Sequence, residues 1–100
     1  MNYEDVFTDW DKIRLQASRK GFLYKDFSGV YEYFVKKGGV QFADNWSETL
    51  SKGEKREFCA KMVVLYDDDL KIKFKALKYL KGRGIIWNEQ ERKFKWYSFC

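Results

Sequence analysis

The C-terminal third of the chain joins one helical pattern to one β-hairpin pattern, and this limits the folds open to it. Apolar residues recur at helical spacing from Leu70 to Lys81. Residues 70–75 also alternate as a strand would, but the good helix formers of residues 76–81 favour the helix. Beyond Gly82-Arg83-Gly84, the runs 84–87 and 93–99 flank a polar turn, which predicts a terminal hairpin.

The first part of the chain predicts an amphipathic helix from Tyr3 to Arg19 that ends before Gly21. Its polar face carries acids and bases together, as a solvated helix does. The expected inward residues are Val6, Trp10, Ile13 and Ala17, and the expected solvated bases are Lys12, Arg14 and Arg19.

The middle of the chain predicts two further helices joined through a short strand and a short helix. One helix starts at Asp26 and closes at Gly38-Gly39, and another covers residues 54–66. Between them, residues 40–42 alternate like a short strand. A short helix follows; its inward residues are Trp46 and Leu50, and its cap is Asp44 or Asn45. Cys59 is expected in the core, and Asp67-Asp68-Asp69 are expected to cap the next helix.

These segments predict a mostly α fold with a C-terminal β-hairpin, an α+β class. From Asp26 onward the order is helix, short strand, helix, helix, hairpin, which is the order of a winged helix-turn-helix. We expect a single domain over residues 1–100, in which residues 1–20 add an extra N-terminal helix to a winged helix over residues 26–100.

Composition excludes several classes of function. The chain has no histidine, so a histidine general base and imidazole metal ligands are ruled out, and we expect neither an enzyme nor a cofactor. Its two cysteines, Cys59 and Cys100, are expected to be reduced thiols. The Asp67–Asp69 run could hold a divalent cation, but a helix cap is the simpler interpretation. No apolar run spans a membrane and the N-terminus does not resemble a signal peptide, so we expect an intracellular protein.

Basic charge gathers on the predicted helix and hairpin. Residues 70–100 carry nine Lys/Arg against two Glu, a local charge of +7, whereas the whole chain has +5. Such a surface predicts binding to double-stranded DNA, mainly through phosphates and with little dependence on sequence. The expected contacts are Lys71, Lys75 and Lys78 on the helix, Arg92, Lys93 and Lys95 on the hairpin, and Arg83 and Arg92 as the only candidate base readers.

Other interpretations of the same region stay open. The lysines could simply fill a solvated helix face. The run 93–97 alternates Lys with aromatics and could stack single-stranded bases, although packing of the hairpin on a helix explains the same pattern. For Trp10, Trp46 and Trp87 we expect burial. We expect Phe94 and Trp96 and, on the other face, Tyr97 and Phe99 to belong to a half-buried sheet. The domain could also be a protein-protein interaction module, docking through the N-terminal helix, or a small stand-alone transcriptional regulator.

From about residue 26 to the end, the chain resembles the C-terminal winged-helix domain of the third subunit of the eukaryotic origin recognition complex. The matching pieces are Gly38-Gly39, the run Val40 to Glu48, the helix Phe74 to Leu80 leading into Gly84-Ile85-Ile86, and the basic wing ending near Lys95-Trp96. The resemblance implies DNA binding in replication initiation, other subunits of a protein complex as partners, and a nuclear location. It also allows the chain to be an excised domain of a larger protein.

Overall fold

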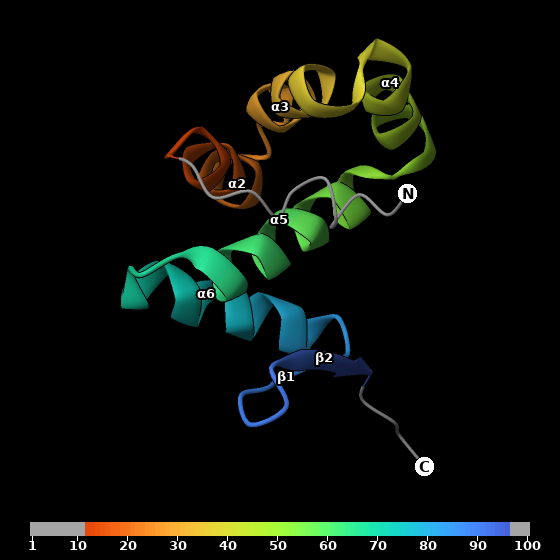
Figure 1. Ribbon diagram of the computed structural model, residues 1–100. Helices are drawn as coiled ribbons and strands as arrows, with labels where there is room; N and C mark the ends of the chain where they lie inside the picture. Colours follow the sequence, from red (N-terminus) through yellow and green to blue (C-terminus); the bar gives the residue numbers. More distant parts are fainter. Residues whose placement is uncertain (1–11, 97–100) are drawn as a thin grey trace.

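The computed structural model describes residues 12–96, which form five helices and then a two-stranded antiparallel hairpin (Figure 1). The mostly helical α+β class with a C-terminal hairpin, in a winged-helix-like layout, is confirmed. The elements are α2 (Lys12–Tyr24), α3 (Ser28–Gly38), α4 (Val40–Thr49), α5 (Lys52–Tyr66), α6 (Leu70–Gly82), β1 (Ile85–Asn88) and β2 (Lys93–Trp96).

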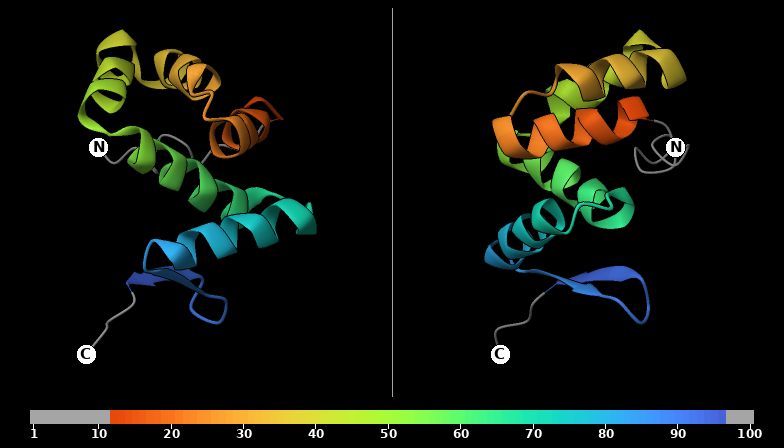
Figure 2. Two further views of the ribbon diagram at one scale, coloured as in Figure 1. Left: turned by 180° about the vertical axis from the view of Figure 1, so that it is seen from behind. Right: turned by 90° about the vertical axis from the view of Figure 1, so that its left-hand side faces the viewer.

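Helix α5 lies at the centre and divides the molecule into two sides. Helices α2, α3 and α4 lie on one side of it, and α6 with the hairpin lies on the other (Figures 1 and 2). Helix α5 packs against both α2 and α6, and β1 packs against α6. The hairpin is therefore attached to the rest of the fold mainly through α6.

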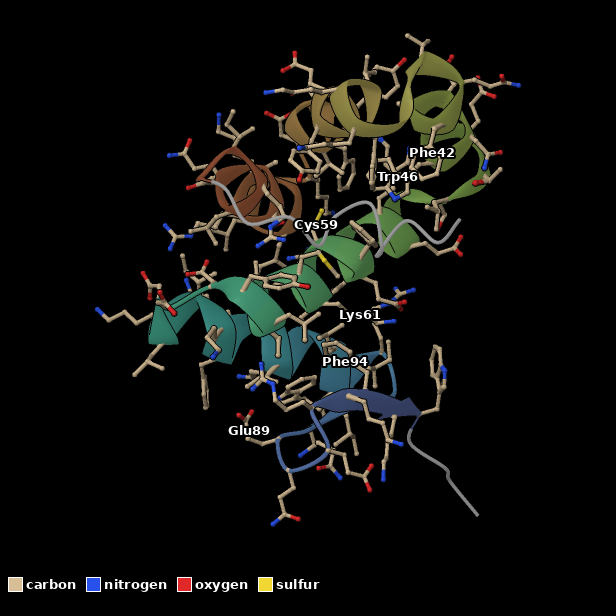
Figure 3. The ribbon with its side chains drawn as sticks, in the orientation of Figure 1. Phe42, Trp46, Cys59, Lys61, Glu89 and Phe94 are labelled. Atoms are coloured by element: carbon tan, nitrogen blue, oxygen red, sulfur yellow. The ribbon has the colours of Figure 1, made fainter. Side chains whose placement is uncertain are left out.

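Aromatic rings fill the space between α3, α4 and α5. Trp46 of α4 is fully buried, and its ring centroid lies 5.3 Å from that of Phe34 and 5.8 Å from that of Phe58. Phe42 packs edge-on against Phe34, and Figure 3 shows Phe42 and Trp46 both coming from α4. The predicted burial of Trp46 is thus confirmed. Tilted ring pairs of this kind stabilise the fold beyond what the burial of their apolar area contributes.

The sequence predicts that the first helix ends before Gly21. This prediction is wrong, because helix α2 continues through Gly21 to Tyr24. Gly21 does not end the helix but lets α2 pack closely on α5, because a Cβ at this position would overlap Cys59 Sγ of α5. Ile13 was also expected to face inward, but its side chain is 57% exposed, whereas Ala17 is buried as predicted. Val6 and Trp10 lie outside the described residues.

Residues 40–42 belong to helix α4 and not to a strand. Gly39 has φ of 92°, which ends α3 and lets α4 begin at once. The predicted glycine stop at 38–39 is therefore confirmed, but the predicted short strand is wrong. Neither Asp44 nor Asn45 is a helix cap, because both lie within α4; Asp44 accepts a hydrogen bond from the Tyr31 hydroxyl of α3.

The two helices nearest the hairpin begin at side-chain caps. Ser51 and Glu54 form a reciprocal capping box at the start of α5, with N–O distances of 3.0 and 3.1 Å. Asp69 accepts hydrogen bonds from the backbone N–H groups of Lys71 and Ile72, so the predicted capping role of the Asp67–Asp69 run is confirmed at Asp69.

Two arginines of α2 are structural, although the sequence predicted a solvated face. Arg14 is 1% exposed, and its guanidinium lies 4.0 Å from the Tyr66 ring centroid. Arg19 donates two hydrogen bonds of 2.6 Å to Asp67, whose side chain is fully buried at the turn between α5 and α6. A planar guanidinium suits such a bidentate pair, which ties α2 to the start of α6.

Candidate nucleic-acid interface

Helix α6 has a buried side, an apolar exposed side and a lysine-bearing exposed side. Ala76 and Leu80 are buried toward the core. Leu70 and Phe74, which helical spacing places on one side of α6 with Leu77, are 77% and 71% exposed. On that side of the helix Leu77 is half-buried next to the hairpin, and Ile72 is also partly buried against the core.

Lys71, Lys75 and Lys78 form an exposed strip on α6, as their spacing predicted. All five charged residues of this 13-residue helix are lysines, and it contains no acid. Among the described residues, no carboxylate lies within 4.0 Å of the Nζ atom of any of the three strip lysines. Their charges are thus directed to solvent without a local acidic partner in that part of the chain.

Arg83 lies at the C-terminal cap of α6, apart from the strip, and is held by α5. Its Nε donates to Glu57 Oε1 at 2.9 Å, and this hydrogen bond raises the pKa of Arg83 above its ordinary value. The guanidinium also packs against Gly53 of α5, where a Cβ would lie only 3.2 Å from Arg83 Nη1. Arg83 therefore fixes the end of α6 against α5 and has fewer donors left for a base edge.

The three basic residues of the hairpin are paired with two acids of the same hairpin. Arg92 Nη1 lies 3.1 Å from Glu89 Oε1, and Glu91 Oε2 lies 2.9 Å from Lys95 Nζ and 3.4 Å from Lys93 Nζ. Hydrogen bonds from Lys95 and Lys93 lower the pKa of Glu91 below its ordinary value, so this carboxylate is ionised at neutral pH. The hairpin's three cations are therefore largely balanced by two carboxylates, in contrast to α6.

The turn of the hairpin explains why these charges meet. Arg92 adopts φ of 51°, and its guanidinium lies 5.4 Å from the Trp87 ring centroid. Trp87 Nε1 in turn donates a hydrogen bond to Glu89, which Figure 3 shows at the tip of the hairpin. Trp87, predicted to be buried, is half-buried, and its ring packs 4.7 Å from that of Phe94.

The two aromatic residues of the described part of β2 share a face of the hairpin but differ in burial. Phe94 packs toward α5, where Lys61 Nζ lies 5.6 Å from its ring centroid, and Figure 3 shows both side chains between α5 and the hairpin. Trp96 was expected in a half-buried sheet but is 73% exposed. Tyr97 and Phe99 lie outside the described residues. Packing thus accounts for Phe94, and only Trp96 of the described β2 residues offers an open ring for stacking.

Residues that could carry other chemistry are engaged in the fold. Cys59 is fully buried, as predicted, and burial raises the pKa of its thiol to about 12, so it is a poor nucleophile at neutral pH. No group of three or more Cys, Asp or Glu within residues 12–96 is arranged to hold a metal ion. None of the described helices is long and apolar enough to cross a membrane.

Sequence reasoning found the lysine strip but missed two features beside it. One is the exposure of Leu70 and Phe74, which helical spacing alone could not reveal because nothing in the sequence shows which face the hairpin covers. The other is the pairing in the hairpin, for which the signal was present: Glu89 and Glu91 come just before Arg92 and Lys93 in a short turn. No protein-family model, curated protein or solved structure matches this chain.

Proposed function

We propose that this protein binds double-stranded DNA through the lysine strip of α6, by contacts to phosphates and with little preference for sequence. The observation that carries the proposal is the charge of α6: it has five lysines and no acid, and three of the lysines form an exposed strip whose Nζ atoms make no ion pair with a described residue. Because α6 directly precedes the hairpin, it occupies the position of the recognition helix in a winged-helix layout.

The dimensions of the strip suit a DNA groove. Lys71 and Lys78 are seven residues apart, which is about 10 Å along a helix axis. The helix itself, about 10–12 Å across with its side chains, matches a major groove about 12 Å wide. Three long lysine side chains at this spacing can therefore reach phosphates along the groove.

The same geometry supports weak sequence discrimination. Bidentate base contacts are usually made by Arg, Asn or Gln, and α6 carries none of these. The two arginines proposed from the sequence as base readers are bound to Glu57 and Glu89. Exposed ion pairs such as Arg92–Glu89 contribute roughly 0–1 kcal/mol, so the hairpin can add contacts, but fewer than its three cations suggested.

The test is the salt dependence of binding to a labelled random duplex, followed by fluorescence anisotropy from about 50 to 200 mM salt. Three phosphate contacts predict a slope of log K against log salt of about −2.7 for the wild type. The triple variant Lys71→Glu, Lys75→Glu, Lys78→Glu should flatten that slope, alike on several DNA sequences. A wild type that does not bind even at low salt would sink the proposal.

A matched control separates the strip from net charge. The variant Lys20→Glu, Lys25→Glu, Lys36→Glu makes the same change in charge at exposed positions of α2, α3 and their connection, across α5 from α6. The slope of log K against log salt for this control variant should stay close to the wild-type slope. If both triple variants lose binding equally, the effect belongs to overall charge and not to α6. A role in replication initiation within a nuclear complex, as the resemblance implies, and a role as a transcriptional regulator both stay predictions.

A further inference from the structure

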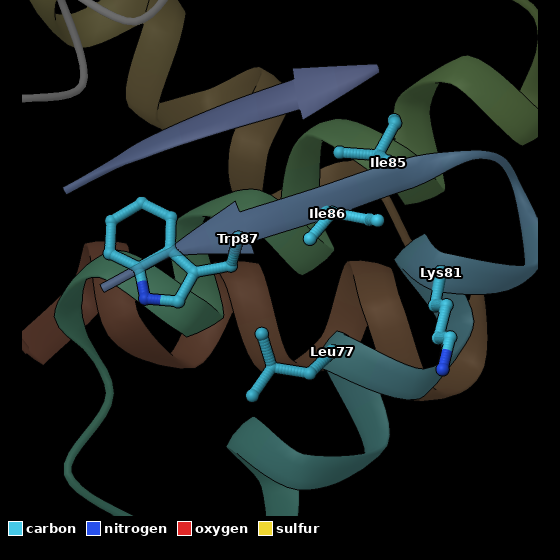
Figure 4. Close-up of a pocket in the computed structure, with 5 residues that line it drawn as sticks. All are labelled: Leu77, Lys81, Ile85, Ile86 and Trp87. Atoms are coloured by element: carbon cyan, nitrogen blue, oxygen red, sulfur yellow. The ribbon is translucent and has the colours of Figure 1, made fainter. Parts of the chain in front are cut away.

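An open groove runs between α6 and β1. One hollow, of about 360 Å³, is lined by Leu77 and Lys81 of α6 and by Ile85, Ile86 and Trp87 of β1 (Figure 4). A second, of about 380 Å³, shares Leu77 and Trp87 with the first and extends toward Leu70, Lys73 and Phe74 of α6. Since the two hollows share these residues, they form one groove along α6, and each reaches the volume usual for a ligand site.

The groove lies along the unpaired edge of β1. Within residues 12–96 the sheet has only two strands, and β1 pairs on one side with β2. No residue of β2 lines either hollow, and Figure 4 shows α6 and the β2 arrow on opposite sides of β1. The predicted strand at residues 40–42, which could have paired with the hairpin, is helical. The outward N–H and C=O groups of β1 thus face the groove and can accept another strand.

The walls and rim of the groove define the chemistry of its occupant. Leu70, Phe74, Leu77 and Trp87 give it apolar walls, and Lys73 and Lys81 lie at its two ends. The one acid among its lining residues, Glu89, is engaged by Trp87 Nε1 and by Arg92. The charge of the groove is therefore complementary to carboxylates, and its apolar walls suit alternate side chains of an extended chain.

We propose that this groove binds an extended, acidic segment of a partner protein, which adds to β1 as a third strand. Alternate apolar side chains of the segment enter between α6 and β1, and its carboxylates meet Lys73 and Lys81. β1 has four residues, so the paired stretch spans about 13 Å. The groove borders the proposed DNA contacts: a third hollow of about 470 Å³, lined by Leu70, Lys71, Phe74 and Lys75, continues it onto the strip, and of the three strip lysines only Lys78 lines none of these hollows.

The test begins with selection of a random-peptide phage library on the full chain, with counter-selection on the variant Ile86→Lys, Lys81→Glu. We expect enriched peptides that alternate apolar with acidic residues. Adding such a synthetic peptide should shift the backbone amide resonances of residues 85–88. N-methylation of the peptide at alternate positions should abolish binding, and methylation at the intervening positions should not, because only alternate amides face β1.

Two single variants of the same helix then distinguish the groove from the DNA strip. Lys81→Glu should weaken binding of the selected peptide about tenfold, whereas Lys78→Glu, the same charge change outside the groove, should leave it within about twofold. For binding of the random duplex we expect the reverse: Lys78→Glu should weaken binding more than Lys81→Glu does. Unchanged amide spectra away from each site would show that both variants are folded.

Three results would overturn the inference. The first is a selection that yields no peptide preferring the wild type over the groove variant. The second is a peptide whose affinity does not depend on N-methylation, which would mean that it docks as a helix or through side chains alone. The third is a duplex, and no peptide, that shifts the amides of residues 85–88, which would assign the groove to DNA.

Discussion

Helices α4 and α6 are both amphipathic and both carry a large aromatic residue, yet they use it in opposite ways. Trp46 of α4 is fully buried against rings from α3 and α5, whereas Phe74 of α6 is 71% exposed. The difference lies in what covers each helix: α4 closes over a core built by two other helices, whereas within residues 12–96 α6 is covered mainly by α5 and a two-stranded hairpin, with one ring contact from Phe22 of α2 to Tyr79. Stability therefore resides mainly in the α2–α5 side of the molecule, and α6 is left to present surface.

The largest effect on the free energy of unfolding should come from truncating Trp46, the buried ring between α3, α4 and α5. Trp46→Ala should lower the free energy of unfolding by about 3–5 kcal/mol, because it leaves a cavity among three helices. Urea denaturation followed by circular dichroism measures this. Trp96→Ala removes an equally large but exposed ring and should change the free energy by less than about 0.5 kcal/mol. Equal losses in both variants would contradict the proposed division of the molecule.

The link between the two sides should rank second. Asp67→Asn leaves Arg19 without its carboxylate and should cost about 2–4 kcal/mol in unfolding free energy. Burial opposes ionisation of Asp67, but hydrogen bonds from Arg19 and the Asp69 N–H outweigh it, so its pKa is lowered in the fold. This contribution is thus fully present above the unfolded pKa of about 3.9 and is lost as pH falls further.

The pH dependence supplies the check on Asp67. The stability gap between wild type and Asp67→Asn should be widest near neutral pH and should narrow below about pH 4. Urea midpoints measured across that range give the gap directly. A gap that stays constant down to low pH would mean that the ion pair does not stabilise the fold.

A smaller effect should follow from releasing the hairpin's cations. Glu89→Gln with Glu91→Gln removes the acids that pair with Arg92, Lys93 and Lys95. If the hairpin faces the duplex, the slope of log K against log salt should steepen by up to about 2. The control Glu32→Gln with Glu48→Gln changes exposed acids of α3 and α4 and should leave the slope nearly unchanged. An identical slope in both variants would place the hairpin away from the DNA.

The smallest effect on stability should come from α6 itself. Phe74→Ser removes a mostly exposed ring and should change the free energy of unfolding by less than about 0.5 kcal/mol. The same variant should weaken binding of the groove peptide, because Phe74 forms part of one wall. A loss of more than about 2 kcal/mol in stability would show that Phe74 belongs to the core.

The comparison also shows where sequence reasoning succeeds. Helices α3, α5 and α6 and the hairpin follow from spacing, caps and glycine stops, all of which act within a few residues. The helical spacing of Phe42, Trp46 and Leu50 was also present, but the short alternation at residues 40–42 concealed it.

The failures depend on contacts between distant residues. The sequence predicts a helix end at Gly21, because it does not show that α5 packs against this glycine. Arg14 and Arg19 read as solvated until Tyr66 and Asp67, about fifty residues away, are brought beside them. For the candidate site, the lysine strip could be predicted because one helix determines it. The groove could not be predicted from the sequence, because α6 and β1 form it together.

The close approach of α2 to α5 at Gly21 has a kinetic consequence. Cys59 Sγ lies directly beneath that glycine and is fully buried, so a thiol reagent can reach it only when α2 separates from α5. With Cys100 replaced by serine, the rate of Cys59 labelling would report how often this part of the fold opens without unfolding as a whole. The chain thus contains its own reporter of local opening, on the side of α5 opposite to both proposed binding surfaces.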